Sequence, residues 1–173
     1  MYAEAVRYRV TERRLQVVKL IATLNYSRPD FSIYASERLG LSRGTVTGHM
    51  GEATHARTGL LCVDISSLVV CWVSEGVLSL DKLVAGRKTE LKRTFAELKP
   101  YEQAILQEIY RCALEKGTVC NKILAPQLKI EMEDLRDKIT LLYRKLRPHY
   151  VTNRPQLATV SCYHEKCLKG NGK

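Results

Sequence analysis

The chain of 173 residues has no long apolar run and no leader-like N-terminus. A membrane-spanning helix needs about eighteen uncharged apolar residues in succession, whereas the best candidate, SSLVVCWVSEGVL, is shorter and contains Glu75. The N-terminal sequence MYAEAVRYRVTERR lacks the apolar segment that a secretion signal places between a basic start and a cleavage site. We therefore expect a cytoplasmic protein with no membrane partner.

Signatures of enzymes and metal proteins are scarce. No glycine-rich phosphate loop and no dinucleotide-binding fingerprint occurs. Cys162, His164 and Cys167 lie close together, but a structural zinc site usually has four ligands in recognisable pairs, and only His149 offers a nearby fourth. A Cys/His nucleophile pair would lack an orienting acid and an oxyanion site. We expect no enzymatic activity and no cofactor; metal binding by the three residues is disfavoured but stays open.

Six cysteines occur, at positions 62, 71, 112, 120, 162 and 167. Most have apolar neighbours, and in such surroundings a free thiol behaves as a small hydrophobic group. Because no secretion signal precedes them, we favour reduced structural cysteines over disulfides.

Acidic residues are outnumbered by basic ones. The chain has 18 Asp and Glu against 28 Lys and Arg, so its net charge is +10. Residues 1–82 hold 10 basic against 8 acidic residues, residues 83–98 hold 4 against 2, and residues 99–173 hold 14 against 8. A basic surface is typical of proteins that bind nucleic-acid phosphates, and it also suits an anionic membrane or an acidic protein.

The apolar pattern of the chain repeats itself. At an offset of 89 residues, the apolar positions Leu39, Leu41, Val46 and Met50 coincide with Leu128, Ile130, Leu135 and Ile139. Upstream, an offset of 88 places TERRLQVVKLIA over KPYEQAILQEIY. Few residues are identical, but apolar positions match apolar positions and capping residues match capping residues. We interpret the pattern as two copies of one helical module.

Each copy predicts four helices. In the first copy we expect a helix from the cap Thr11 to about residue 24 and a short helix over 31–39 that Gly40 stops. A third helix is expected over 43–58, between the cap Ser42 and Gly59, and a fourth from the cap Asp64 to near Gly76. In the second we expect a helix from Pro100 to about residue 116, a short helix over 122–128 capped by Thr118 or Asn121 and distorted by Pro126, a third over 132–147, and a fourth capped by Asn153.

The predicted fold class is therefore all-α, with two tandem four-helix helix-turn-helix modules joined by a helical connector. The modules are expected over residues 1–82 and 98–164. The basic connector, residues 83–97, is expected to form one or two helices with a break at Gly86. Residues 165–173 are expected to form a frayed, flexible tail.

Motifs in both copies resemble the LuxR/GerE-type DNA-binding domain of bacterial transcription regulators. The first copy supplies the turn Leu39-Gly40-Leu41-Ser42, then Thr45-Val46 and His49, and the second supplies Tyr143-Arg144-Lys145-Leu146, Asn153-Arg154 and Gln156-Leu157. Many members of that family carry a receiver or ligand-binding domain, for which this chain has no room. The resemblance implies a bacterial, phage or plasmid regulator that reads duplex DNA with the third helix of a module.

The third helices are expected to bury one stripe and offer the opposite one to the major groove. The buried stripes are Val46, Met50 and Ala53 in one copy, and Leu135, Ile139, Leu142 and Leu146 in the other. The residues expected at DNA are Ser42, Arg43, Thr45, Thr47, Gly48, Gly51 and His55, with Lys129, Arg136, Lys138, Thr140 and Arg144 from the second copy. Glu131, Glu133 and Asp134 begin the second copy's helix and would repel phosphate, so that copy is expected to contact either phosphate or protein.

The fourth helices are the expected pairing surface. SSLVVCWV is apolar nearly all round, more than one small module needs to bury. By the resemblance, Leu68, Val69, Trp72 and Leu157 would lie at an interface between the two modules, giving a pseudo-dimer, or between two chains, giving a homodimer. A plain core helix is the alternative.

Two functions follow from this interpretation. The first is a nucleoid-associated, sequence-specific transcriptional regulator that binds duplex DNA. The second is an adaptor or anti-activator that acts through RNA polymerase or another regulator, because AILQEIY and LLYRKLR also resemble region four of bacterial sigma factors.

Overall fold

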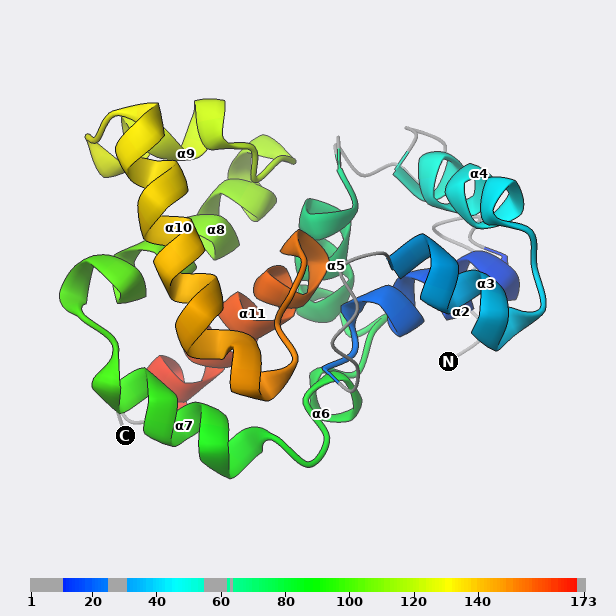
Figure 1. The fold of residues 1–173 in the computed structure, drawn as a ribbon, viewed down its shortest axis with the longest axis horizontal. Helices are drawn as coiled ribbons and strands as arrows, with labels where there is room; N and C mark the ends of the chain where they lie inside the picture. The colour runs from blue at the N-terminus through cyan, green and yellow to red at the C-terminus, as the bar shows by residue number, and fades with distance from the viewer. Residues whose placement is uncertain (1–10, 25–30, 55–61, 63, 171–173) are drawn as a thin grey trace.

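In the computed structural model, residues 11–24, 31–54, 62 and 64–170 are described, and every regular element in them is a helix (Figure 1). The all-α fold class is thereby confirmed. No helix in the described part of the chain combines the length and apolar character needed to cross a membrane.

The N-terminal helices α2 (Glu12–Ala22), α3 (Phe31–Leu39) and α4 (Arg43–Thr54) pack on one another at one end of the molecule (Figure 1). As expected, Thr11 caps α2, its hydroxyl accepting a hydrogen bond from the Arg14 backbone N–H. A small cluster of Val17, Ile21, Ala35 and Val46 holds the three helices together. The end of the third helix, expected at Gly59, lies outside the described residues.

The centre of the molecule is built from α5 (Ile65–Ser74), α8 (Pro100–Lys116) and α11 (Arg154–Gly170). Each packs against the other two (Figure 1). The expected caps are confirmed: Asp64 accepts from the Ser67 N–H at 2.8 Å, and Asn153 accepts from the Gln156 N–H at 2.9 Å. The large core extends from these helices to Val18 and Ala22 of α2.

Two helices, α6 (Leu80–Leu83) and α7 (Lys88–Glu97), lie between α5 and α8, with the expected break at Gly86, whose φ is +75°. The connector thus contributes α7, whereas α6 begins within the expected first module. The expectation of a frayed tail from residue 165 was wrong over residues 165–170, because α11 continues to Gly170. Packing extends this helix, since Cys167 contacts the large core.

The remaining helices are α9 (Asn121–Leu128), α10 (Met132–Leu146) and the short 3-10 helix η2 (Arg147–His149). The capping expectation for α9 was wrong: Cys120 is its N-cap, and Asn121 is its first residue. The Thr118 hydroxyl instead donates a hydrogen bond to the Asp64 carboxylate at 2.8 Å. Pro126 lies inside α9 close to its end.

Local structure repeats at the offset seen in the sequence. The Leu41 N–H donates to the Ser36 carbonyl at 3.0 Å, and 89 residues later the Ile130 N–H donates to the Ala125 carbonyl at 3.2 Å. Gly40 and Lys129, also 89 residues apart, both adopt the left-handed conformation, with φ of +62° and +55°. The repeat in the apolar pattern therefore corresponds to a repeat in helix ends and turns.

Candidate nucleic-acid interface

The turn between α3 and α4 has the geometry expected at the start of a recognition helix. Gly40 takes a left-handed conformation that a residue with a side chain adopts only at a cost. Ser42 then caps α4, its hydroxyl accepting a hydrogen bond from the Thr45 N–H at 3.0 Å. The Ser42 and Thr45 hydroxyls are 2.8 Å apart. The N-terminal end of α4 therefore presents hydroxyls and the positive end of the helix dipole to solvent.

The buried stripe expected for α10 is confirmed, and that expected for α4 is confirmed except at Met50. On α4, Val46 and Ala53 are buried and Met50 is half-buried. On α10, the buried residues are Leu135, Ile139, Leu142 and Leu146. The opposite faces of both helices are consequently open to solvent.

The candidate DNA-contacting residues of α4 lie on its exposed face. Those exposed are Ser42, Arg43, Thr45, Thr47, Gly48 and Gly51, whereas His55 lies outside the described residues. The Thr47 hydroxyl donates a hydrogen bond back to the Arg43 carbonyl at 3.0 Å. Glu52 is the acidic residue of this helix, and its carboxylate pairs with Arg14 of α2. Arg14 thus offsets the negative charge that would otherwise repel a phosphate.

Gly48 and Gly51 lie on the exposed face of α4, where the structure leaves room for a side chain. A Cβ atom added at either position would meet nothing within 4 Å. Each glycine destabilises a helix by roughly 1 kcal/mol relative to alanine. The exposed face of α4 therefore carries two unfavourable residues that internal packing does not explain.

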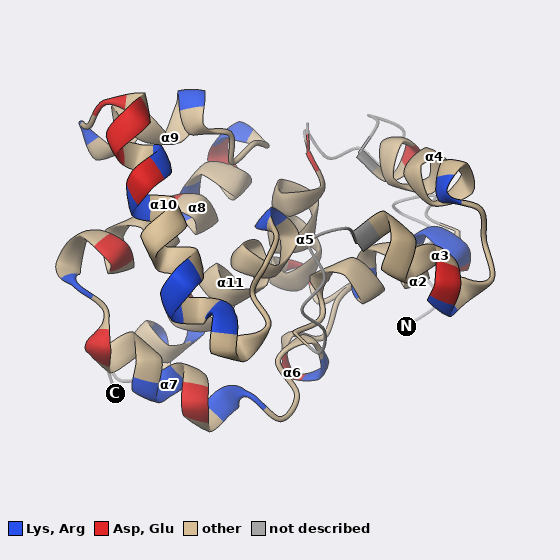
Figure 2. Cartoon of the chain, viewed as in Figure 1, with Lys and Arg blue, Asp and Glu red and all other residues tan. Residues whose placement is uncertain are grey.

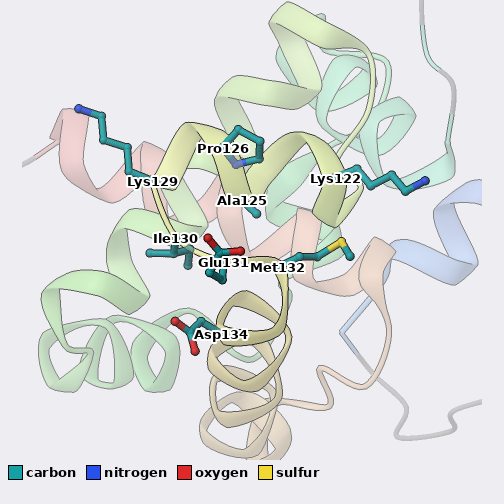
Figure 3. A pocket seen from close by; sticks show the side chains of 8 residues that line it. All are labelled: Lys122, Ala125, Pro126, Lys129, Ile130, Glu131, Met132 and Asp134. Atoms are coloured by element: carbon teal, nitrogen blue, oxygen red, sulfur yellow. The ribbon is translucent and has the colours of Figure 1, made fainter.

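The corresponding turn between α9 and α10 opens into a hollow (Figure 3). It is lined by Lys122, Ala125, Pro126, Lys129, Ile130, Glu131, Met132 and Asp134. The lysines Lys122 and Lys129 extend outward on either side, while the carboxylates of Glu131 and Asp134 lie below the turn (Figure 3). This turn has the same length as the turn before α4, three residues, but it carries Lys129 and Glu131, whereas Gly40, Leu41 and Ser42 are uncharged.

The candidate residues of the second copy are not equally available. Lys129, Arg136, Thr140 and Arg144 are exposed, and so is the acidic Asp137. Lys138 is half-buried, with its Nζ 5.3 Å from the centre of the Tyr101 ring on α8. This cation–π contact holds Lys138 against α8 and away from the exposed face of α10.

A groove between α7 and the end of α10 was missed by sequence reasoning. Its lining includes Arg93 and Glu97 of α7, with Arg144 and Lys145 of α10. Figure 2 shows basic and acidic residues along α7 and basic residues in the C-terminal part of α10. The connector's positive charge was visible in the sequence, but only packing brings α7 beside Arg144.

His149 joins the two sides of this groove. Its Nε2 lies 2.7 Å from the Thr94 hydroxyl. Burial lowers the pKa of His149 below its ordinary value, and the nearby Glu90 carboxylate partly opposes that shift. The imidazole is therefore neutral near pH 7, so it adds no positive charge to the groove.

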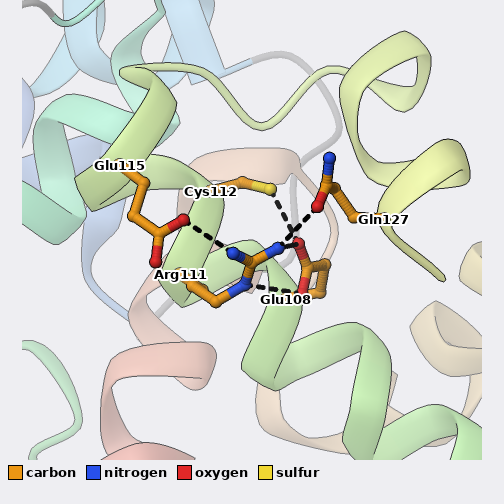
Figure 4. A network of polar contacts seen from close by, with 5 residues as sticks. All are labelled: Glu108, Arg111, Cys112, Glu115 and Gln127. Atoms are coloured by element: carbon orange, nitrogen blue, oxygen red, sulfur yellow. Dashed lines mark hydrogen bonds and ion pairs between the residues drawn. The ribbon is translucent and has the colours of Figure 1, made fainter.

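A polar network fastens α8 to α9 (Figure 4). Arg111 donates hydrogen bonds to Glu108, Glu115 and Gln127, and the Cys112 thiol donates to Glu108 at 2.9 Å. Burial alone would raise the pKa of Glu108, but the bonds from Arg111 and Cys112 lower it below its ordinary value. Within this network, the hydrogen bond from Arg111 to Gln127 is the contact that links α8 to α9.

The predicted pairing residues lie in the core. Leu68, Val69 and Trp72 of α5 and Leu157 of α11 are fully buried, and the two helices pack against each other within one chain. None of these four side chains is available to a second molecule.

Cys162, His164 and Cys167 do not converge. They belong to one helix, α11, where positions two residues apart point to nearly opposite sides. Among the described residues, no group of three or more His, Cys, Asp and Glu side chains could hold a metal ion. Burial raises the pKa of Cys162 to about 12 and lowers the pKa of His164.

Comparison with known proteins provides no relative. No protein-family model matches the chain, and neither a curated protein nor a solved structure matches it. The functional argument therefore rests on the chain's own residues.

Proposed function

We propose that this chain is a sequence-specific transcriptional regulator that binds duplex DNA through α4. The observation that carries the proposal is the pair Gly48 and Gly51 on the exposed face of that helix, where an added Cβ would meet open space. Glycine at an exposed helical position is accounted for if another backbone, here that of DNA, must approach closely.

The N-terminal end of α4 suits a phosphate. Ser42, Arg43 and Thr45 are exposed there and provide hydroxyls and a guanidinium. The helix dipole adds partial positive charge at the same place. With a net charge of +10, the chain would gain most of its affinity from phosphate contacts, and binding would weaken steeply with salt.

The second turn and helix, α9 and α10, are proposed as a second helix-turn-helix with a supporting role. Arg136, Thr140 and Arg144 are exposed on α10, but its first turn carries Glu133 and Asp134. Phosphate contact is therefore expected nearer the C-terminal half of α10, where Arg144 faces the groove beside α7. Packing of α5 on α11 would make one chain a pseudo-dimer with two DNA-facing helices.

Selection from random duplex DNA, at a low and a physiological salt concentration, tests this function. Enrichment of a two-part motif that is lost on Arg43→Ala is expected. Lys116→Ala, which removes an exposed positive charge at the end of α8, is the matched control and should leave the motif unchanged. A one-part motif would mean that α10 contacts the DNA backbone or a protein without recognising bases. Absence of any enriched sequence would refute the proposal.

An adaptor that binds a protein partner is the second candidate. The observation favouring it is that Leu114 and Leu168 remain 44% and 40% exposed. Both line the same depression between α8 and α11. Leu114→Ser and Leu168→Ser should abolish transcriptional effects of an adaptor, whereas a DNA-binding regulator should tolerate them and lose function with Arg43→Ala.

A further inference from the structure

Two thiols outside the candidate DNA interface lie in contact beside α5. The Cys62 thiol donates a hydrogen bond to the Cys71 sulfur, and the two Sγ atoms are 3.3 Å apart. Cys71 lies on α5, and Cys62 lies two residues before the cap Asp64. Both belong to the large core, with 3% and 7% of their surfaces exposed. The two sulfurs therefore need only a small approach to form a bond.

The two thiols differ in how readily they ionise. The hydrogen bond from Cys62 lowers the pKa of Cys71 below its ordinary value, against the opposing effect of burial. The same hydrogen bond, with burial, raises the pKa of Cys62. The other buried thiols are less reactive, since burial raises the pKa of Cys112 and of Cys162 to about 12. Geometry assigns the roles in the same sense: Cys71 accepts the S–H of Cys62 and keeps the larger exposed fraction, 7% against 3%. We therefore assign Cys71 as the attacking thiol and Cys62 as the partner that resolves it.

We propose that Cys62 and Cys71 form a reversible intramolecular disulfide when the protein is exposed to hydrogen peroxide. In the first step the Cys71 thiolate attacks one peroxide oxygen, forming Cys71 sulfenic acid and releasing hydroxide. In the second step the Cys62 sulfur attacks the sulfenic sulfur; the S–S bond forms, the Cys62 proton joins the departing hydroxide, and water leaves. The two sulfurs lose two electrons, and the peroxide is reduced. Hydrogen peroxide is a small oxidant, and a small oxidant is needed because so little of either thiol is exposed.

This disulfide would join α5 to a residue that lies between α4 and α5 in the sequence. Closing that loop restricts the unfolded chain, so oxidation should raise the thermal midpoint, and a thiol reductant should reverse the rise. Bond formation does not depend on the proposed DNA binding.

Peptide mapping of the intact, folded chain tests the proposal. A protease that cuts before aspartate separates the two thiols, because Asp64 lies between them: fragment 30–63 contains Cys62 alone, and fragment 64–80 contains Cys71 alone. After peroxide treatment and blocking of free thiols, the two fragments should be joined, and a reductant should release them. Free thiols blocked on both fragments would overturn the proposal. So would a bond from Cys71 to any other cysteine, or irreversible oxidation of Cys71 without a bond.

Two variants sharpen the assignment. Cys162→Ser removes another buried thiol and should leave the joined fragments unchanged. Cys62→Ser removes the resolving thiol, so Cys71 should stop at the sulfenic acid, which dimedone traps as a stable adduct. Absence of that adduct would overturn the assignment of Cys71 as the attacking thiol.

Discussion

Gly48 and Gly51 are notable because each occupies a position where the structure leaves room for a side chain. Open space surrounds both positions. The contrast is Gly76, whose φ of +77° lies in the left-handed region. Conformation accounts for glycine at Gly76, whereas on α4 the proposed approach of a DNA backbone would account for it.

We expect Gly48→Ala and Gly51→Ala each to raise the free energy of unfolding by up to about 1 kcal/mol, because alanine favours a helix more than glycine does. If α4 binds DNA as proposed, both variants should bind it more weakly, since the added methyl group would face the duplex. Urea unfolding and a binding titration measure the two effects. As a control, Gly76→Ala should destabilise by about 1–2 kcal/mol. Unchanged DNA affinity would contradict the close approach of the α4 backbone.

Asp64 connects segments that are distant in the sequence. One carboxylate oxygen caps α5 through the Ser67 N–H, and the other accepts bonds from the Thr118 hydroxyl and the Val119 N–H. Asn153 occupies the equivalent position of α11 and caps Gln156. Comparing Asn153 with Asp64 therefore separates the contribution of a helix cap from that of the additional tertiary hydrogen bonds.

We expect Asp64→Ala to lower the free energy of unfolding by about 2–4 kcal/mol, the sum of a lost cap and an unsatisfied buried N–H. Asn153→Ala should cost about 1 kcal/mol, the typical value for a cap alone. Urea denaturation of the two variants measures the difference. Equal losses would mean that the bonds to Thr118 and Val119 contribute little.

Among the helices, α4 and α10 have similar buried stripes and different exposed faces. The stripes follow from helical spacing, so they were predictable from Val46 and Leu135 onward. The sequence also predicts which residues lie on the exposed faces, but it does not predict which of their side chains are free of contacts with other helices. Lys138 shows why: its position on the helix is correct, but Tyr101 of α8 engages its ammonium group.

Under the proposed function, the salt dependence of DNA binding would separate the roles of α4 and α10. Each lost phosphate contact should reduce the slope of log K against log salt by about 0.9. We expect that reduction for Arg43→Ala on α4 and for Arg144→Ala on α10, and no change for Lys116→Ala. Titrations at several salt concentrations measure the slopes. A slope unaffected by Arg144→Ala would leave α4 as the phosphate-binding helix and α10 as a protein-contact helix.

The molecule as a whole shares one large core across the expected module boundary. The Thr159 hydroxyl of α11 donates to the Ala22 carbonyl of α2 at 2.8 Å, and the Leu24 N–H donates to the Leu83 carbonyl at 2.9 Å. The hydroxyl of Ser67 on α5 donates to the Gly117 carbonyl at 2.7 Å. The bonds of Thr159 and Ser67 cross between the two repeats, and that of Leu24 joins the first repeat to the connector, so we expect neither repeat to be stable alone.

A fragment of residues 83–173 tests that expectation. It lacks α5, so the buried faces of α8 and α11 would be exposed to water. We expect no cooperative thermal transition for the fragment and a single one for the full chain, as followed by circular dichroism. A cooperative transition in the fragment would instead show that the second repeat folds independently.

Two buried histidines make the stability of the whole chain depend on pH. Burial lowers the pKa of His149 and of His164. As the pH falls below about 6.5, the unfolded chain takes up protons at these residues before the folded chain does, so the free energy of unfolding decreases. The carboxyl groups with lowered pKa, Asp81 and Glu108, act in a more acidic range.

We expect the urea midpoint to fall between about pH 7.5 and pH 5.5, within the range where these histidines take up protons. His149→Gln combined with His164→Phe should flatten that dependence. Phenylalanine keeps an aromatic ring against Phe95, which packs edge-on to His164 at 5.0 Å. If the double variant keeps the slope of the parent chain, the two histidines are not its cause.

The sequence alone was sufficient for the local structure. Caps at Thr11, Ser42, Asp64 and Asn153 mark helix starts, and Gly40 marks a stop, because such signals act through hydrogen bonds and φ angles within a few residues. The failures had a tertiary cause. Asp64 engages Thr118, which was expected to cap α9, and core packing extends α11 into the expected tail.

Packing between distant segments decided which helices contact one another. Only the folded chain places α7 beside Arg144 and the Cys62 thiol against Cys71, and it selects the packing of α5 on α11 from the alternatives that the sequence left open. The apolar pattern shows which face of a helix is buried but not which partner covers it, since many faces are equally apolar. Shape complementarity among all the helices selects the partner, and that information is spread over the whole sequence.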